Sequence, residues 1–216
     1  MKVYNNLSDY IKVPNAIVTI GTFDGVHLGH QAILKDMVCA AKEIGGETVV
    51  ITFYPHPRQV LNIDSSNLRF INTQEEKLKH LEKLGIDNVI VVNFTKEFSL
   101  ISSETFISDY IVKNIAPVKL VIGYDHRFGH NRAETFEDYC RYGRELGIHI
   151  MQATAYTQEQ DKISSSAIRR ALLSGDVMTA QKYLGYNYFL EGTVVSGYQV
   201  GRKIGFPTAN LRVNFP

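Results

Sequence analysis

The stretch of sequence that decides the fold is Ile20-Gly21-Thr22-Phe23-Asp24-Gly25-Val26-His27-Leu28-Gly29-His30, a glycine-rich turn that ends in two histidines three residues apart. Residues 16–20, which lead into it, are apolar and mostly β-branched, a pattern typical of a buried parallel strand. After the turn, apolar side chains recur at helical spacing between Ile33 and Ile44. The turn is therefore predicted to join a strand to a helix.

This strand-to-helix turn predicts a site for a triphosphate. Gly21 and Gly25 let the backbone turn sharply and approach a ligand, and the following helix offers unpaired N–H groups to phosphate. Gly29 leaves room for a flat purine against the backbone. His27 and His30 share the first helical turn, where they can donate hydrogen bonds to charge developing on phosphoryl oxygens. The alternative, a capped helix with two incidental histidines, is disfavoured because glycines and histidines coincide at one turn.

Residues 163–170, Ile-Ser-Ser-Ser-Ala-Ile-Arg-Arg, form a second candidate anion site. Ser164, Ser165 and Ser166 can cap a helix and, with its free N–H groups, cradle an anion. Arg169 would lie one turn further on and present a planar fork to phosphate oxygens. By itself the pattern fits a capped helix with a solvated arginine equally well. Asp24 in the first motif can orient its loop through backbone hydrogen bonds, or can be an ordinary Asx-turn residue.

Length and charge describe an ordinary globular chain. The 216 residues suit one well-buried domain with a small addition. The 23 Lys and Arg residues nearly balance 22 Asp and Glu, giving a net charge of +1, so nucleic acid is not an expected partner. No apolar run approaches membrane-spanning length and the N-terminus has no signal-peptide pattern, so no membrane partner and a cytoplasmic location are expected. The sequence gives no oligomeric state.

The two cysteines, Cys39 and Cys140, are far apart and lack the spacing of metal ligands. Each is expected to be a buried, reduced thiol.

Short β-rich runs alternate with amphipathic segments along most of the chain. Strands are predicted at residues 47–53, 88–92, 118–122 and 149–153, which indicates an α/β fold with a doubly wound parallel sheet. Thr73-Gln74-Glu75-Glu76 is a capping-box pattern that opens a helix ending before Gly85, and a second helix is predicted from about Ser102 to Ile115. Ligands of such sheets bind outside the carboxyl ends of the strands.

The pattern changes near residue 186. Residues 188–195 are strand-like and residues 196–202 are rich in turn formers, with no helix between strands. This predicts the start of an antiparallel β domain, of which about 30 residues are present, fewer than the roughly 40 that usually hold a core unaided.

The glycine turn, Gly-x-Phe-Asp-Gly-x-His-x-Gly-His, resembles the signature of the HxGH nucleotidyltransferase superfamily, whose members transfer a nucleotidyl group to a phosphate and have a Rossmann-like fold. The serine-rich segment fits the second motif of that superfamily. The resemblance implies catalytic roles for His27, His30 and Arg169. It implies nucleotide contacts from Gly21, Thr22, Phe23, Asp24, Gly25, Gly29, Ser164, Ser165 and Ser166.

Two further loops narrow the acceptor. Phe53-Tyr54-Pro55-His56-Pro57-Arg58 and Gly123-Tyr124-Asp125-His126-Arg127-Phe128-Gly129 each follow a predicted strand. Two prolines around a histidine favour an extended, rigid loop, and stiff apolar walls suit a planar ring. Both loops resemble the flavin-site loops of the bacterial bifunctional riboflavin kinase/FAD synthetase family, which implies flavin contacts from Pro55, His56, Pro57, Asp125 and Phe128. Without the resemblance, His56 is more simply a loop histidine and Phe128 a core residue.

The tail, from Gly192-Thr193-Val194-Val195 to Pro207-Thr208-Ala209-Asn210-Leu211, resembles the opening of the riboflavin kinase domain of the same family. Thr208 and Asn210 match positions that help to hold magnesium and ATP there. The implied organisation is an FMN adenylyltransferase domain over residues 1–185 and the N-terminal fragment of a kinase β-barrel over 186–216. The family's kinase catalytic acid would lie beyond Pro216, so kinase activity, with riboflavin as substrate, is expected only of the full-length protein.

The activity implied by the resemblance is transfer of the adenylyl group of ATP to FMN, with Mg²⁺ bridging the phosphates and release of pyrophosphate and FAD. Two alternatives stay open: a nucleotidyltransferase that uses another phosphomonoester, and a flavin- or ATP-binding fragment without turnover.

Overall fold

The computed structural model describes residues 1–63, 69–124, 129, 134–153, 157–158 and 161–213. Its centre is a six-stranded sheet in the order β1-β4-β3-β2-β5-β6, with every neighbouring pair parallel. The strands are β1 (Lys2–Tyr4), β2 (Ile17–Ile20), β3 (Thr48–Tyr54), β4 (Asn88–Asn93), β5 (Lys119–Ile122) and β6 (His149–Gln152). The chain runs outward from β2 to β4 and then crosses to β5 on the other side of β2. This is the predicted Rossmann-like, doubly wound arrangement.

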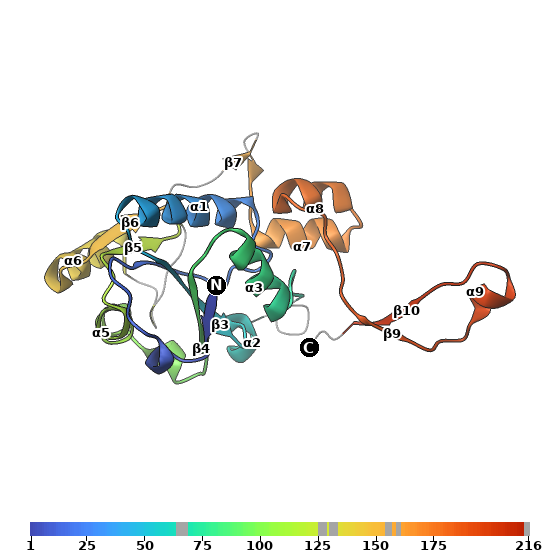
Figure 1. The fold of residues 1–216 in the computed structure, drawn as a ribbon, viewed down its shortest axis with the longest axis horizontal. Coiled ribbons are helices and arrows are strands. Elements are labelled where there is room, and N and C mark those ends of the chain that lie inside the picture. The colour runs from blue at the N-terminus through green and yellow to red at the C-terminus, as the bar shows by residue number, and fades with distance from the viewer. Residues whose placement is uncertain (64–68, 125–128, 130–133, 154–156, 159–160, 214–216) are drawn as a thin grey trace.

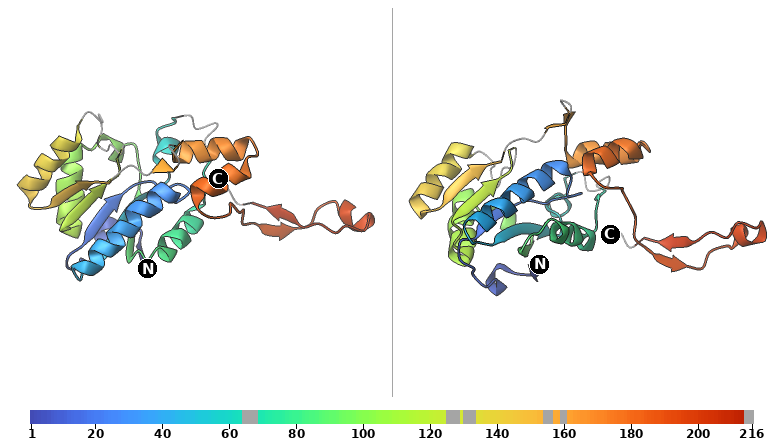
Figure 2. Two further views of the ribbon diagram at one scale, coloured as in Figure 1. Left: turned by 90° about the horizontal axis from the view of Figure 1, so that it is seen from above. Right: turned by 45° about the horizontal axis from the view of Figure 1, so that its top comes forward.

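Helices cover both faces of the sheet (Figures 1 and 2). Because side chains alternate along a strand, β2 contributes Val18 and Ile20 to one core and Ile17 to the other. The core containing Ile17 is closed by α1 (Leu28–Glu43) and α3 (Gln74–Lys83). The opposite core is closed by η3 (Phe106–Val112), α5 (Lys113–Ile115) and α6 (Phe136–Leu146), and the short α4 (Ser103–Thr105) leads into η3.

The predicted strands and helices are confirmed with small shifts of their ends. The capping box at Thr73 is formed in both directions, since its hydroxyl accepts from the Glu76 amide and its own amide donates to the Glu76 carboxylate. The helix predicted from Ser102 to Ile115 forms as α4, η3 and α5, with π-helical geometry in its middle. Strand β1 was not predicted, because three residues are too few to carry a periodicity.

A pair of helices, α7 (Ser165–Leu173) and α8 (Val177–Leu184), follows the sheet. Their apolar sides enclose a third cluster that includes Ile71, Ile163 and Ile168. The remaining short elements of the described chain before the tail are η1 (Leu7–Asp9), α2 (Pro57–Val60), η2 (Phe98–Leu100), β7 (Thr157–Gln158) and β8 (Asp161–Lys162).

The tail after α8 forms an antiparallel ribbon of β9 (Thr193–Val195) and β10 (Asn210–Arg212), linked through α9 (Val200–Lys203). Figure 1 shows this ribbon reaching away from the parallel sheet. The expected antiparallel β segment is present, but the strand predicted over 188–195 is confined to its last three residues. Large apolar side chains of the tail, such as Phe206 and Ile204, are exposed.

The prediction for the cysteines was wrong in one respect. Both thiols are free, but Cys39 is exposed and Cys140 only half-buried. Cys39 lies on the outer side of α1, where its helical position and not its apolar character sets its exposure. Among the described residues no helix combines the length and apolar character needed to cross a membrane.

Candidate active site

The glycine turn lies directly after β2, at the edge of the sheet where the carboxyl ends of the parallel strands meet. His27 is the N-cap of α1: its Nδ1 accepts a hydrogen bond from the His30 amide at 3.3 Å. The two imidazole rings stack with centroids 3.6 Å apart and planes 16° from parallel. Because Nδ1 of His27 accepts this hydrogen bond, Nε2 is the ring nitrogen left to act as a donor. The two histidines are thus held together at the start of the helix.

At Gly21 and Gly25 the protein's own packing leaves little room for a side chain. Gly25 has a φ of +82°, and a Cβ there would lie 2.9 Å from Cδ1 of Ile71. A Cβ on Gly21 would lie 3.0 Å from the ring of Phe23, whose edge-to-face contact with His30 has centroids 5.2 Å apart. Phe23 is buried and packs against the ring of His30. It is not in the lining of the cavity described below.

Asp24 joins three parts of the site. One carboxylate oxygen accepts from the Ile71 amide at 2.9 Å, and the other accepts from Nη1 of Arg169 in an ion pair. Burial raises the pKa of the Asp24 carboxyl, and the Ile71 amide and the Arg169 guanidinium oppose that shift. Asp24 therefore ties the glycine turn to α7 and to the segment before α3, a long-range role that replaces the Asx-turn alternative.

The serine cluster supports the same junction. Ser164 caps α7 by accepting from the Ala167 amide, and Ser165 donates to the Asp24 carbonyl oxygen at 2.9 Å. Nη2 of Arg169 lies 3.4 Å from the Ser166 hydroxyl. The hydroxyls of Ser164 and Ser165 are thus engaged by the protein, which differs from the expected open cradle of three hydroxyls. Contacts from this cluster to an anion stay a prediction.

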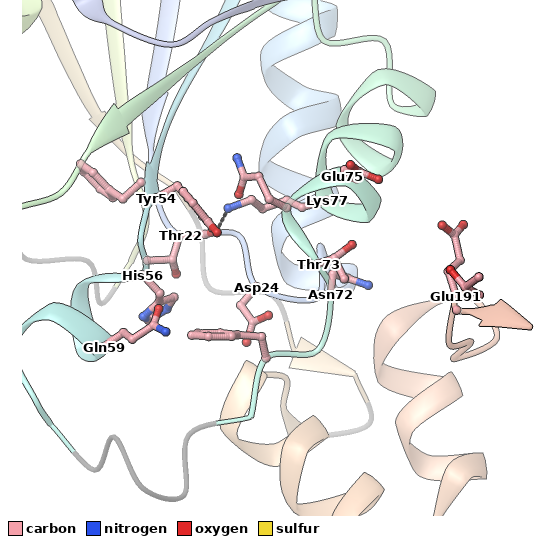
Figure 3. Close-up of a pocket in the computed structure, with 15 residues that line it drawn as sticks. Thr22, Asp24, Tyr54, His56, Gln59, Asn72, Thr73, Glu75, Lys77 and Glu191 are labelled. Atoms are coloured by element: carbon pink, nitrogen blue, oxygen red, sulfur yellow. Dashed lines mark hydrogen bonds between the residues drawn. The ribbon is translucent and has the colours of Figure 1, made fainter. Parts of the chain in front are cut away.

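A cavity of about 430 Å³ opens beside the glycine turn (Figure 3). Its size falls in the range of small-molecule sites. Figure 3 shows Tyr54, His56 and Gln59 on one side, and Asn72, Thr73 and Glu191 on the other. The lining consists of Thr22, Asp24, Phe53, Tyr54, His56, Gln59, Phe70, Asn72, Thr73, Gln74, Glu75, Lys77, Glu191, Gly192 and Thr193. The cavity therefore combines aromatic side chains with two residues of the glycine turn.

Lys77 is the main residue of this cavity that the sequence analysis missed. It is 8% exposed, and its ammonium donates to the Thr22 carbonyl at 3.2 Å and to Oγ1 of Thr52 at 3.1 Å. Burial lowers the pKa of Lys77 to about 8, although the nearby Asp24 carboxylate partly opposes this. Its spacing of four residues from the buried Leu81 places both on the inner face of α3, and this spacing was the available signal.

His56 lies in the cavity lining, but the loop around it differs from the expected extended form. Pro57 is the first residue of α2, and Nδ1 of His56 caps that helix by accepting from the Arg58 amide at 3.1 Å. Burial, together with the positive charges of Lys77 and Arg169, lowers the pKa of His56 to about 4. Pro55 and Pro57, which flank His56, are not in the lining. Asp125 and Phe128 lie outside the described residues.

The remaining predicted site residues, Thr208 and Asn210, lie in the tail ribbon. Asn210 begins β10, and its side chain packs against Gly197, where a Cβ would approach it within 2.4 Å. The cavity lining includes Thr193 at the start of β9 but neither Thr208 nor Asn210.

Two family models match this chain. Residues 11–167 match the FAD synthetase family, and residues 184–216 match the riboflavin kinase family. The bifunctional riboflavin kinase/FMN adenylyltransferase of Listeria monocytogenes is 40% identical over 93% of this chain and 63% of its own length. The Escherichia coli protein of the same name is 34% identical over 98% of this chain and 68% of its own.

A solved structure titled as a macrolide-efflux protein from Streptococcus pneumoniae superposes with a TM-score of 0.86 at 29% identity, covering 99% of this chain and 69% of that one. The chain thus spans about two thirds of the length of these relatives. The FAD synthetase match covers most of the sheet, the glycine turn and the start of α7. This chain therefore belongs to the FAD synthetase family.

Proposed function

We propose that this protein transfers the adenylyl group of ATP to the phosphate of FMN, forming FAD and pyrophosphate. The observation that carries the proposal is the sharing of Thr22 and Asp24 between the histidine-bearing glycine turn and the aromatic cavity. A nucleotide bound at the start of α1 and a flavin bound in the cavity would meet at these residues.

The reaction needs positioning more than proton transfer. An oxygen of the FMN phosphate attacks the α-phosphorus of ATP, the bond from that phosphorus to the bridging oxygen breaks, and pyrophosphate leaves with the electron pair. A phosphate monoester is already largely ionised at neutral pH, so a general base is not required. Holding the two phosphates in line and stabilising the charge on the α-phosphate supply the acceleration. His27 and His30, at the start of α1, are the proposed donors to that charge.

The cavity offers a cation and several aromatic side chains. The ammonium of Lys77 lies in the lining, together with the carboxylates of Asp24, Glu75 and Glu191, of which Asp24 is already paired with Arg169. The lowered pKa of His56 keeps its imidazole neutral at pH 7, so that ring offers a flat, uncharged wall. Phe53, Tyr54 and Phe70 provide the remaining aromatic surface for a planar ring system.

Magnesium is implied by the family resemblance. In the described part of the chain, no three His, Cys, Asp or Glu side chains are grouped to hold a metal ion. Asp24, the buried carboxylate of the cavity, already accepts from Ile71 and Arg169. The described residues therefore do not fit an ion held by the protein. Mg²⁺ is proposed only as a companion of the ATP phosphates, and no step is assigned to it.

The domain organisation is proposed from the same matches. Residues 1–185 would form the FMN adenylyltransferase domain, and residues 186–216 would belong to a riboflavin kinase domain. Thr208 and Asn210 are the proposed magnesium and ATP contacts of that second domain, where riboflavin would be the substrate.

The test incubates the protein with ATP, Mg²⁺ and FMN and follows FAD by chromatography and pyrophosphate by a coupled assay. Equal amounts of both products support the proposal. FMN binding without pyrophosphate would indicate a binding protein, and no FMN binding would indicate another acceptor such as pantetheine phosphate.

His30→Ala should lower turnover by roughly 100- to 1000-fold, because it removes one donor to the transition state. Its affinity for FMN, measured by quenching of flavin fluorescence, should stay within about twofold of the wild type, since His30 is outside the cavity lining. Wild-type turnover in this variant would refute the role given to His30.

A further inference from the structure

The end of α8 and the residues that follow it contact the glycine turn. In the sequence these residues lie after the end of the FAD synthetase match. Tyr186 donates a hydrogen bond from its hydroxyl to the Gly25 carbonyl oxygen at 2.7 Å. Two residues earlier, the Leu184 carbonyl accepts from Nε2 of Gln31 at 2.8 Å. Between them, Gly185 packs so closely on Leu28 that a Cβ would lie 2.5 Å from its Cδ2. Residues 184–186 thus touch both the turn and the first turns of α1.

Tyr186 is held in place for this contact. Its ring stacks on His80 with centroids 4.2 Å apart, and its hydroxyl also lies 3.2 Å from the side-chain amide of Asn72. A phenol has one hydrogen to donate, so the shorter contact to Gly25 identifies the acceptor. Burial raises the pKa of the Tyr186 hydroxyl, so it stays protonated and remains a donor across the physiological range.

The anchored peptides lie immediately before His27. Gly25 has a φ of +82° and Val26 a φ of +35°, a conformation that β-branched residues rarely adopt and that needs outside support. Tyr186 holds the Gly25 carbonyl, while the Val26 amide on the same peptide plane donates to the Phe23 carbonyl at 3.1 Å. The next carbonyl, that of Val26, accepts from the same Gln31 nitrogen that reaches Leu184. Of the two consecutive peptides before His27, the first is therefore held directly by Tyr186 and the second by Gln31, whose side chain also donates to Leu184.

We propose that Tyr186 is a positioning residue for the nucleotide, holding the Gly25–Val26 peptide so that His27 and the start of α1 are ready to receive the ATP phosphates. This inference rests on the proposed function. Tyr186 lies beyond residue 167, where the FAD synthetase match ends, and inside the riboflavin kinase match over 184–216. The adenylyl-transfer site thus takes a supporting residue from the segment assigned to the other activity.

A neighbouring contact supports the same inference. Glu191 forms an ion pair with Lys79 of α3 at 3.1 Å, and residues 191–193 line the cavity. The segment after α8 therefore runs past both the glycine turn and the cavity before it enters the ribbon.

The test compares Tyr186→Phe with Tyr198→Phe, a control in the same segment whose side chain is 94% exposed. Binding of a non-hydrolysable ATP analogue is measured by calorimetry, and the KM values for ATP and FMN are measured in the FAD-forming assay. Loss of one hydrogen bond should weaken analogue binding and raise the KM for ATP by roughly threefold to tenfold. The KM for FMN and the values for the control should stay within twofold of wild type.

Gln31→Met provides a second route to the same peptides, since it removes the donor shared by Val26 and Leu184. It should produce the same selective loss of ATP affinity, which keeps the inference testable if Tyr186→Phe folds poorly. Unchanged analogue affinity in both variants, or equal losses for ATP and FMN, would overturn the positioning role. Absence of FAD formation by the wild-type protein would overturn the proposed function instead, and the analogue titration would still test the contact.

Discussion

The buried ammonium of Lys77 makes the stability of this protein depend on pH in an unusual direction. Burial lowers the pKa of Lys77 from 10.5 to about 8 in the folded state. Between these two values the unfolded chain binds more protons at this site than the folded one, so stability rises with pH and the penalty of burying the charge disappears. The Thr22 carbonyl and the Thr52 hydroxyl can still accept from the neutral amine.

The size of the effect follows from the two pKa values. Raising the pH from 7 to 9.5 should increase the contribution of Lys77 to the free energy of unfolding by about 2 kcal/mol. Urea unfolding at intervals over this range, followed by circular dichroism, measures the free energy in the wild type and in Lys77→Met. The free energy of unfolding of the wild type minus that of the variant should rise by about that amount, because methionine carries no proton.

Lys79→Met is the matched control, since Lys79 lies on the exposed side of the same helix and leaves Lys77 in place. It should keep the wild-type pH dependence. If the free energy of unfolding of the wild type minus that of Lys77→Met stays constant or falls as the pH rises, the ammonium of Lys77 is not buried as the structure has it.

Two further predictions concern groups of the same cavity. The ring protons of His56 should titrate by NMR with a midpoint near pH 4, because burial and the charges of Lys77 and Arg169 lower its pKa to about 4. The contribution of His56 to stability should be lost as the pH falls from 6.5 toward 4. A midpoint above pH 6 would contradict this environment. Asp24→Asn should destabilise the fold by about 3 kcal/mol in urea unfolding, because it leaves the mostly buried Arg169 without its carboxylate; Arg169→Met in the same background should recover part of that loss, and additive effects of the two substitutions would refute their coupling.

The elements that sequence alone predicted are those with strong local patterns. The β-branched run that became β2, the capping box at Thr73 and the serine cap of α7 each carry their signal within a few residues. Their positions also allowed the carboxyl edge of the sheet to be recognised as the place for a ligand. The pairing of β1 with β4 and the contact of Tyr186 with Gly25 join residues that are far apart in the sequence, and no local pattern marks them.

The residues of the candidate site divide in the same way. His27 and His30 could be chosen because residues three apart at a helix start must lie together. Lys77 could not, because a lysine on a helix is normally solvated and only the neighbouring β3 and glycine turn bury this one. Asp24 could be predicted from its place in the glycine turn, but its ion pair with Arg169 could not, because that pair depends on where α7 packs.

The glycine turn by itself determined a strand, a sharp bend and a helix start that holds two histidines, because backbone conformation and helical spacing are local properties. The tertiary structure alone decided what supports that turn: the Asp24–Arg169 pair, the buried ammonium of Lys77 and the hydroxyl of Tyr186. The physical reason is that hydrogen bonds and ion pairs depend on distance in space, and packing the helices against the sheet brings together groups that the sequence separates by up to 161 positions.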